Sequence, residues 1–159
     1  MTYRITDRCV GCGMCSKICP VSCIAGRPRK LHEVDRNRCI DCGACGRICP
    51  HNAVLDAIGR RCERIRRQAL HWVKPLFDYV LCMSCAACID ACPSACLGVT
   101  YTADTKDRKA YPYLMDRAAC IACRFCALEC PVDAITMKAA ADMAEEEKKS
   151  LDGPFATGV

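Results

Sequence analysis

One cysteine pattern recurs four times along the chain and limits what the chain can fold into. The pattern is C-x-x-C-x-x-C-x-x-x-C-P, and its copies begin at Cys9, Cys39, Cys82 and Cys120. The starts lie 30 residues apart in the first pair and 38 in the second, and the third copy starts 43 residues after the second. A repeat of this kind indicates repeated structural units. We therefore predict two halves, each built from two copies of the pattern.

The cysteines are expected to bind metal rather than to form disulfides. The chain has 159 residues, of which 19 are cysteines and only nine are aromatic, so two modules of about 60 residues would have thin apolar cores. The cysteine count is odd, and the few polar residues before Cys9 do not form a signal peptide. Both facts favour reduced cysteines and a cytoplasmic location. No segment approaches the roughly 20 apolar residues that cross a bilayer.

The spacing of the cysteines is typical of [4Fe–4S] clusters. Three cysteines three residues apart can point their sulfurs at one cluster, and in two-cluster ferredoxins the fourth, before proline, ligates the cluster of the other motif. Structural zinc instead prefers two separated ligand pairs. With adjacent motifs paired, the first cluster takes Cys9, Cys12, Cys15 and Cys49, the second Cys39, Cys42, Cys45 and Cys19, the third Cys82, Cys85, Cys88 and Cys130, and the fourth Cys120, Cys123, Cys126 and Cys92.

Three cysteines lie outside the motifs. Cys23 and Cys96 follow the fourth cysteine of motifs one and three by four residues, where motifs two and four have alanine. Because free cysteine packs as a small hydrophobic residue, we interpret both as buried side chains near a cluster, with a spare ligand as the alternative. Cys62 is predicted to be a core residue of the segment between the halves.

The expected fold class is α+β, with two tandem bacterial 2[4Fe–4S] ferredoxin modules of short hairpins and short helices. The modules would span residues 1–57 and 76–137. A basic amphipathic helix over 58–75 would join them, and 138–159 would form a C-terminal helix and tail. Short strands are predicted over 3–6, 31–35, 77–81 and 111–115, and a lengthened hairpin over 102–113.

The positive charge of the chain is local. The formal net charge is +5, but four [4Fe–4S]²⁺ cores with their thiolates would bring the loaded chain to about −3. Residues 58–74 carry an excess of basic side chains, namely Arg60, Arg61, Arg64, Arg66, Arg67 and Lys74 against Glu63. The arginine-rich part, residues 60–67, lacks the aromatic platform expected for binding single strands, so we expect a protein partner rather than nucleic acid.

At its four motifs the chain resembles the polyferredoxin subunits of redox complexes. Its size and two-pair layout are most similar to the small four-cluster subunit of bacterial tungsten aldehyde oxidoreductases, and to the one in class II benzoyl-CoA reductase. The resemblance covers residues 1–138 and implies a larger tungsten–pterin subunit, with an FAD subunit that exchanges electrons with NAD. The iron–sulfur subunits of dimethyl sulfoxide reductase and formate dehydrogenase are also similar. These often pair motifs in nested fashion, first with fourth and second with third, which would exchange the fourth ligands.

The sequence thus predicts a non-catalytic electron-transfer subunit with four [4Fe–4S] clusters, acting between a larger tungsten- or molybdenum-pterin subunit and another redox partner. A freely diffusing polyferredoxin and the iron–sulfur subunit of a formate dehydrogenase, hydrogenase or dimethyl sulfoxide reductase-like complex are the alternatives. No glycine-rich nucleotide loop and no catalytic constellation stand apart from the cysteines. Self-association in an oligomer is a further possibility, whereas insertion into a membrane is not expected.

Overall fold

The computed structural model describes residues 2–66, 68–101 and 108–139. The chain divides into two compact units, Met1–Gln68 and Ala69–Val159. Each unit contains two of the cysteine motifs. Along the described ranges, no helix combines the length and the hydrophobicity needed to cross a membrane.

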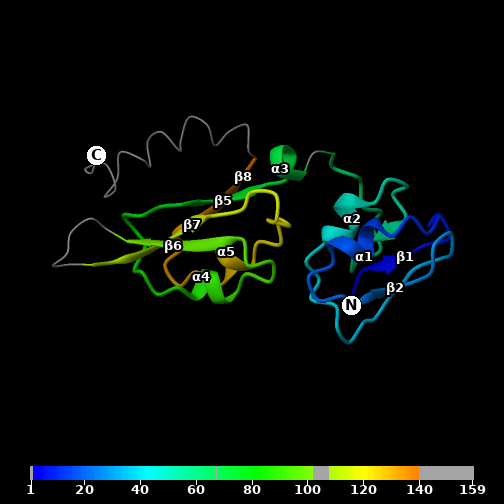
Figure 1. Ribbon diagram of the computed structural model, residues 1–159, viewed down its shortest axis with the longest axis horizontal. Coiled ribbons are helices and arrows are strands. Elements are labelled where there is room, and N and C mark those ends of the chain that lie inside the picture. Colours follow the sequence, from blue (N-terminus) through cyan, green and yellow to red (C-terminus); the bar gives the residue numbers. More distant parts are fainter. Residues whose placement is uncertain (1, 67, 102–107, 140–159) are drawn as a thin grey trace. The chain divides into compact units, whose positions relative to one another are not determined.

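The first unit consists of two small antiparallel sheets and two short helices (Figure 1). Its elements are β1 (Arg4–Ile5), α1 (Met14–Ile18), β2 (Ile24–Ala25), β3 (Glu33–Val34), α2 (Ala44–Ile48) and β4 (Val54–Leu55). Strand β1 pairs with β4, so that Ile5 faces Val54, and β2 pairs with β3. The first and last strands therefore close the unit around the inner hairpin.

The second unit repeats this order of strands and helices after one additional short helix (Figure 1). Its elements are α3 (Gln68–His71), β5 (Lys74–Phe77), α4 (Ala87–Asp90), β6 (Leu97–Tyr101), β7 (Ala110–Leu114), α5 (Phe125–Leu128) and β8 (Ile135–Lys138). Strand β5 pairs with β8, and β6 pairs with β7 over five residues each. The predicted longer hairpin is therefore present, although residues 102–107 at its tip lie outside the described part.

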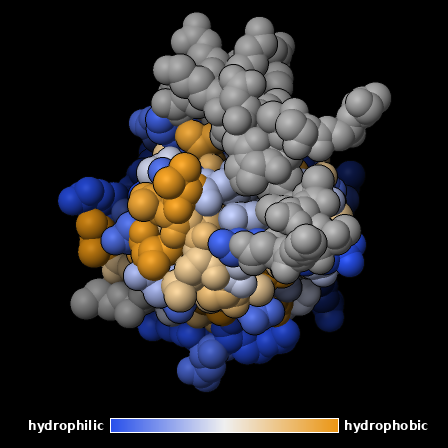
Figure 2. All heavy atoms as spheres, turned by 90° about the vertical axis from the view of Figure 1, so that its left-hand side faces the viewer, coloured by the Kyte–Doolittle hydropathy of each residue, from blue (hydrophilic) through white to orange (hydrophobic). Residues whose placement is uncertain are grey.

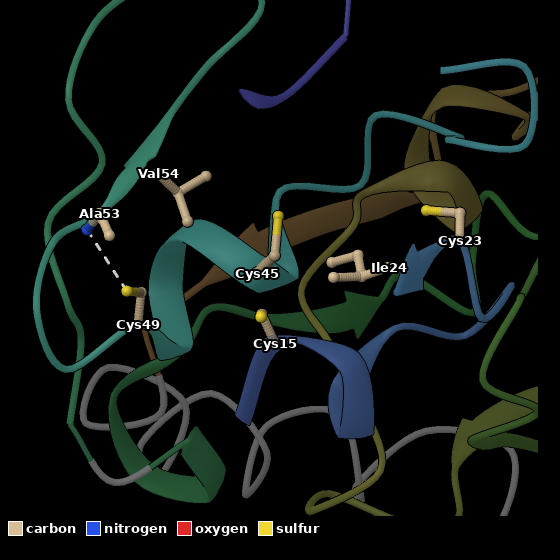
Figure 3. Packing of buried hydrophobic residues seen from close by; sticks show 7 residues of the cluster. All are labelled: Cys15, Cys23, Ile24, Cys45, Cys49, Ala53 and Val54. Carbon is tan, nitrogen blue, oxygen red and sulfur yellow. Dashed lines mark hydrogen bonds between the residues drawn. The ribbon is translucent and has the colours of Figure 1, made fainter. Parts of the chain in front are cut away.

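The two hydrophobic cores are small and rich in cysteine. Figure 3 shows the core of the first unit, which consists of Cys15, Cys23, Ile24, Cys45, Cys49, Ala53 and Val54. The core of the second unit consists of Phe77, Cys88, Cys96, Leu97, Cys120, Cys126 and Ile135. Four of the seven residues in each core are cysteines. The cysteines therefore make up a large part of each small core, which agrees with the thin apolar cores that the composition predicts.

The predicted continuous helix over 58–75 is wrong. Its described part contains one helical turn, α3, and residues 58–66 are not helical. The carboxylate of Asp56 accepts hydrogen bonds from the amides of Ile58 and Arg60, and Gly59 has a φ of 85°. The amide of Cys62 then donates to the carbonyl of Val54. These amides thus bond to Asp56 and Val54 and not to the carbonyls of a helix. The segment therefore returns alongside β4.

Two other expectations about the second half need correction. The strand predicted over 77–81 lies earlier, at β5, and Pro75 is inside this strand, opposite Met137, rather than at the end of a helix. The C-terminal strand β8 reaches Lys138. The C-terminal helix and tail were predicted over 138–159, but Lys138 is in this strand, and residues 140–159 lie outside the described part.

Candidate metal centres

The four cysteine loops share one backbone conformation. In each loop, the second and fourth residues after the first cysteine have a positive φ, at Gly11 and Gly13, Asp41 and Gly43, Ser84 and Ala86, and Ala122 and Arg124. The later residue of each pair is the N-cap of the helix that follows, α1, α2, α4 or α5. This turn places the third cysteine of every motif inside a short helix, and all four of these cysteines are buried.

An aspartate shapes the entrance to three of the four loops. The carboxylate of Asp78 accepts hydrogen bonds from the amides of Val80 and Leu81, at 2.9 and 3.3 Å. Asp116 and Asp35 make corresponding bonds in the fourth and second loops. In the first loop, Thr6 instead donates from its amide and its hydroxyl to the carbonyl of Ala53. Each loop is thus anchored just before its first cysteine.

Cysteines of different motifs meet in common pockets. One pocket, of about 330 Å³, is lined by Cys9, Cys12, Cys15 and Cys49. A second, of about 320 Å³, is lined by Cys19, Cys39, Cys42 and Cys45, with Cys23 at its wall. A third, of about 350 Å³ in the other unit, is lined by Cys82, Cys85, Cys88 and Cys130. Each pocket combines three cysteines of one loop with the fourth cysteine of its neighbour.

The fourth predicted set is also brought together. Burial, together with the nearby thiols of Cys123, Cys120 and Cys92, raises the pKa of Cys126 to about 12. Burial likewise raises the pKa of Cys15 and that of Cys88 to about 11. These thiols hold their protons firmly, so that metal binding would have to displace the protons.

Backbone amides point at the sulfur of the fourth cysteines. The amide of Ala53 donates to Cys49 Sγ at 3.3 Å (Figure 3), and that of Ala134 donates to Cys130 Sγ at 3.2 Å. The amide of Cys23 donates to Cys19 Sγ at 3.4 Å. Such donors stabilise a negatively charged sulfur, and therefore fit thiolate ligands of an iron–sulfur cluster.

The cysteines are not arranged for a single ion. All 19 cysteines lie in the described part, and none of them forms a disulfide bond. Within residues 2–66, 68–101 and 108–139, no group of three or more His, Cys, Asp or Glu side chains is positioned to hold one metal ion. A tetrahedral zinc site would draw four thiolates to about 2.3 Å from one centre. The spacing of the cysteines in each motif is what favours a [4Fe–4S] cluster over zinc.

The structure shows contacts of the predicted ligands that sequence reasoning did not identify. The Sγ atoms of Cys23 and Cys19 are 3.5 Å apart, and those of Cys96 and Cys92 are 3.4 Å apart. Lys74, expected in an exposed basic helix, is fully buried. Only the matching positions of Cys23 and Cys96 in the repeat hinted at a shared role. Cys62 is half-buried, packed at the edge of the first core.

Of the comparisons with known proteins, a family model indicates iron–sulfur binding. A family model described as a 4Fe-4S dicluster domain matches residues 8–53 and residues 81–134. Among solved structures, a chain of a formate dehydrogenase–heterodisulfide reductase–formylmethanofuran dehydrogenase complex from Methanospirillum hungatei is similar, with 22% identity and a TM-score of 0.36. The match covers 82% of this chain and 52% of that chain, so this chain spans about half of its length. No curated protein matches significantly.

Proposed function

This chain belongs to the family of 4Fe-4S dicluster domains, and we propose that it is the electron-transfer subunit of a larger oxidoreductase, with two clusters in each of its units. When bound, [4Fe–4S] clusters supply one-electron redox chemistry. The chain itself supplies ligands, spacing, hydrogen bonds and shielding from water.

The observation that carries this proposal is the grouping of the cysteines in pockets. In three pockets, three cysteines of one loop meet the fourth cysteine of the adjacent loop. This grouping supports adjacent pairing of motifs one with two and three with four, and thus the sixteen ligands assigned by the spacing. The core of the first unit includes Cys15 of one set together with Cys45 of the other. A common core would hold the two clusters of the unit close enough for electron transfer between them.

Exposed cysteines offer places where electrons can enter and leave. The second cysteine of motifs one and three, Cys12 and Cys85, is exposed, whereas the third cysteine of each motif is buried. The pocket with Cys85 is also lined by Met83, whose side chain is 61% exposed. Figure 2 shows hydrophobic side chains gathered on one face of the second unit. A redox partner that covers such a surface would exclude water and approach the cluster closely.

The basic segment after β4 is a second candidate docking surface. Arg60, Arg61, Arg64 and Arg66 are exposed. Asn52 anchors this segment, since its carbonyl accepts from Arg61 Nη1 at 2.8 Å and its side-chain oxygen accepts from the amide of Arg64 at 3.0 Å. Asn52 follows Pro50 and His51, which line the first pocket. We propose that an acidic face of a redox partner binds here, beside the first cluster.

The catalytic partner that we favour is a tungsten- or molybdenum-pterin subunit, with an FAD/NAD subunit as the second redox partner. Only the resemblance of the motifs supports this choice. A freely diffusing polyferredoxin is the alternative.

Two measurements on native protein purified without oxygen test the proposal. Iron and acid-labile sulfide should each reach about 16 atoms per chain, and dithionite should reduce the clusters to a state visible by electron paramagnetic resonance. Co-purification with a larger subunit that contains tungsten or molybdenum would identify the complex. A content of zinc in place of iron would overturn the electron-transfer function, whereas a loaded chain that purifies alone would favour the diffusing carrier.

A further inference from the structure

Two cysteines outside the motifs lie against cysteines that the motifs assign as ligands. Cys23 is 4% exposed, and its Sγ lies 3.5 Å from that of Cys19. Cys96 is 3% exposed, and its Sγ lies 3.4 Å from that of Cys92. Both distances are within the range of a hydrogen bond between sulfurs. The same contact thus occurs once in each unit, at equivalent positions of the repeat.

The other two motifs provide an internal comparison. At the same position they have Ala53 and Ala134, which are buried to the same degree, with 1% and 3% exposed. Their amides donate to Cys49 and Cys130, just as the amide of Cys23 donates to Cys19. The backbone donor is therefore shared, and the thiol is an addition that only motifs one and three have.

If one of the two cysteines binds iron, the other must be the donor of the hydrogen bond between them. A sulfur bonded to iron is a thiolate and has no proton to donate. The proton must then belong to Cys23 or Cys96. The thiol of Cys23 also has a hydrogen-bond interaction with Cys39, and that of Cys96 with Cys120, which the motifs assign to the same clusters as Cys19 and Cys92. A hydrogen bond to a ligand sulfur stabilises the more negative, reduced form of a cluster and so raises its reduction potential.

We propose that Cys23 and Cys96 are positioning residues that donate an S–H hydrogen bond to a ligand sulfur of the second and of the fourth cluster, and thereby raise the potential of one cluster in each unit above that of its neighbour. This inference rests on the proposed function, in which Cys19 and Cys92 complete the second and fourth clusters. Cys49 and Cys130, which complete the first and third clusters, lack the additional donor. Electrons within each unit would then move from the cluster without the thiol to the cluster with it.

Substitutions that remove the thiol and substitutions that add one test the inference. They are made in the full-length chain, with its clusters assembled without oxygen. Cys23→Ala should keep the full iron content and lower the midpoint potential of about a quarter of the reducible iron, in a titration followed by electron paramagnetic resonance. Cys23→Ser, which keeps a donor, should remain close to the native midpoint. The reverse substitution Ala53→Cys should raise a different midpoint. Resonance Raman spectra of the native protein should show an iron–thiolate band that shifts in D₂O, and this shift should weaken in Cys23→Ala.

The outcomes separate the possible roles. A Cys23→Ala protein with full iron and unchanged midpoints would overturn the inference and leave a purely packing role. Loss of iron from this variant would overturn it in favour of a spare ligand. Cys96→Ala and Ala134→Cys repeat the test in the second unit if the first pair does not fold. A native chain that holds no iron would instead contradict the proposed function itself.

Discussion

Lys74 and Cys120 are joined by a buried hydrogen bond of 2.9 Å, in which the lysine Nζ donates to the backbone carbonyl of the cysteine. Lys74 is in strand β5 and is 0% exposed, and Cys120 is the first cysteine of the fourth motif. The bond connects the strand that closes the second unit to a loop 46 residues away in sequence. A basic side chain that the sequence assigns to a surface therefore anchors a cysteine loop.

Replacing Lys74 by methionine should destabilise the second unit. Lys74→Met keeps most of the side-chain volume but leaves the buried carbonyl of Cys120 without this donor, at a cost of about 1–3 kcal/mol. Anaerobic thermal or guanidinium unfolding of the loaded protein measures the loss. Lys30→Met makes the same chemical change at an exposed lysine and should alter stability by no more than about 0.5 kcal/mol. Equal effects of the two substitutions would show that the buried bond contributes little.

Gly43 and Gly13 occupy equivalent positions in the second and first loops, but their surroundings differ. Both have a positive φ, of 71° and 75°, so alanine at either position should cost about 1–2 kcal/mol in backbone strain. A Cβ atom at Gly43 would also lie 2.6 Å from the hydroxyl oxygen of Tyr3, whereas at Gly13 the nearest atom is Ser16 Oγ at 3.9 Å. Gly43→Ala should therefore lower the unfolding free energy more than Gly13→Ala. The reverse order would mean that Tyr3 moves aside easily.

The third loop has alanine where the first two have these glycines, and it offers the opposite experiment. Ala86 has a φ of 61° and is exposed, so Ala86→Gly removes backbone strain with little loss of packing. We expect a gain of up to about 1 kcal/mol in the unfolding free energy of the second unit. Denaturant unfolding of the loaded chain provides the measurement. Stabilisation would confirm that the four loops share one strained conformation, and destabilisation would argue that chain entropy outweighs the strain.

The sequence predicted the parts of the fold that depend on local spacing. The four loops, the division into halves and the longer second hairpin follow from motifs and turn residues within a few positions of one another. The predicted linker helix is absent because the turn at Asp56 and Gly59 redirects the backbone, and this turn outweighs the apolar periodicity on which the prediction rested. The burial of Lys74 depends on the pairing of β5 with β8, a contact between distant segments that the spacing of cysteines does not indicate.

The candidate site, like the fold, has features that the local spacing predicts and others that it does not. The identity of the sixteen motif cysteines follows directly from the repeated spacing, and their role as ligands stays a prediction. The contacts of Cys23 and Cys96 arise because the turn after each Cys-Pro returns the chain past the preceding sulfur. In the first unit this turn has a φ of 48° at Ser22. Sequence alone places these two cysteines at equivalent positions but does not give the distance to their partners.

The raised pKa of Cys126 predicts how the iron-free chain reacts with an alkylating reagent. Burial and the neighbouring thiols raise this pKa from 9.0 to about 12, so the thiolate is scarce at neutral pH. Since the thiolate is the reactive form, the alkylation rate at Cys126 should still increase about tenfold per pH unit between pH 9 and 11. Iodoacetamide labelling followed by peptide mass spectrometry measures the rate at each cysteine. In urea, the rate should level off near pH 9.

The same shift determines the sign of the stability change with pH in the iron-free chain. The fold raises the pKa of Cys126 above its unfolded value, so the unfolded state releases this proton first as the pH rises. The stabilisation from keeping the thiol protonated is complete below about pH 9 and is lost progressively as the pH rises towards about 12. Unfolding of the iron-free chain should thus require less denaturant at pH 10 than at pH 8. A Cys126→Ala chain provides the control, because it lacks this contribution and should show a weaker pH dependence. An unchanged dependence in that variant, or a labelling rate at native Cys126 that levels off near pH 9, would contradict the raised pKa.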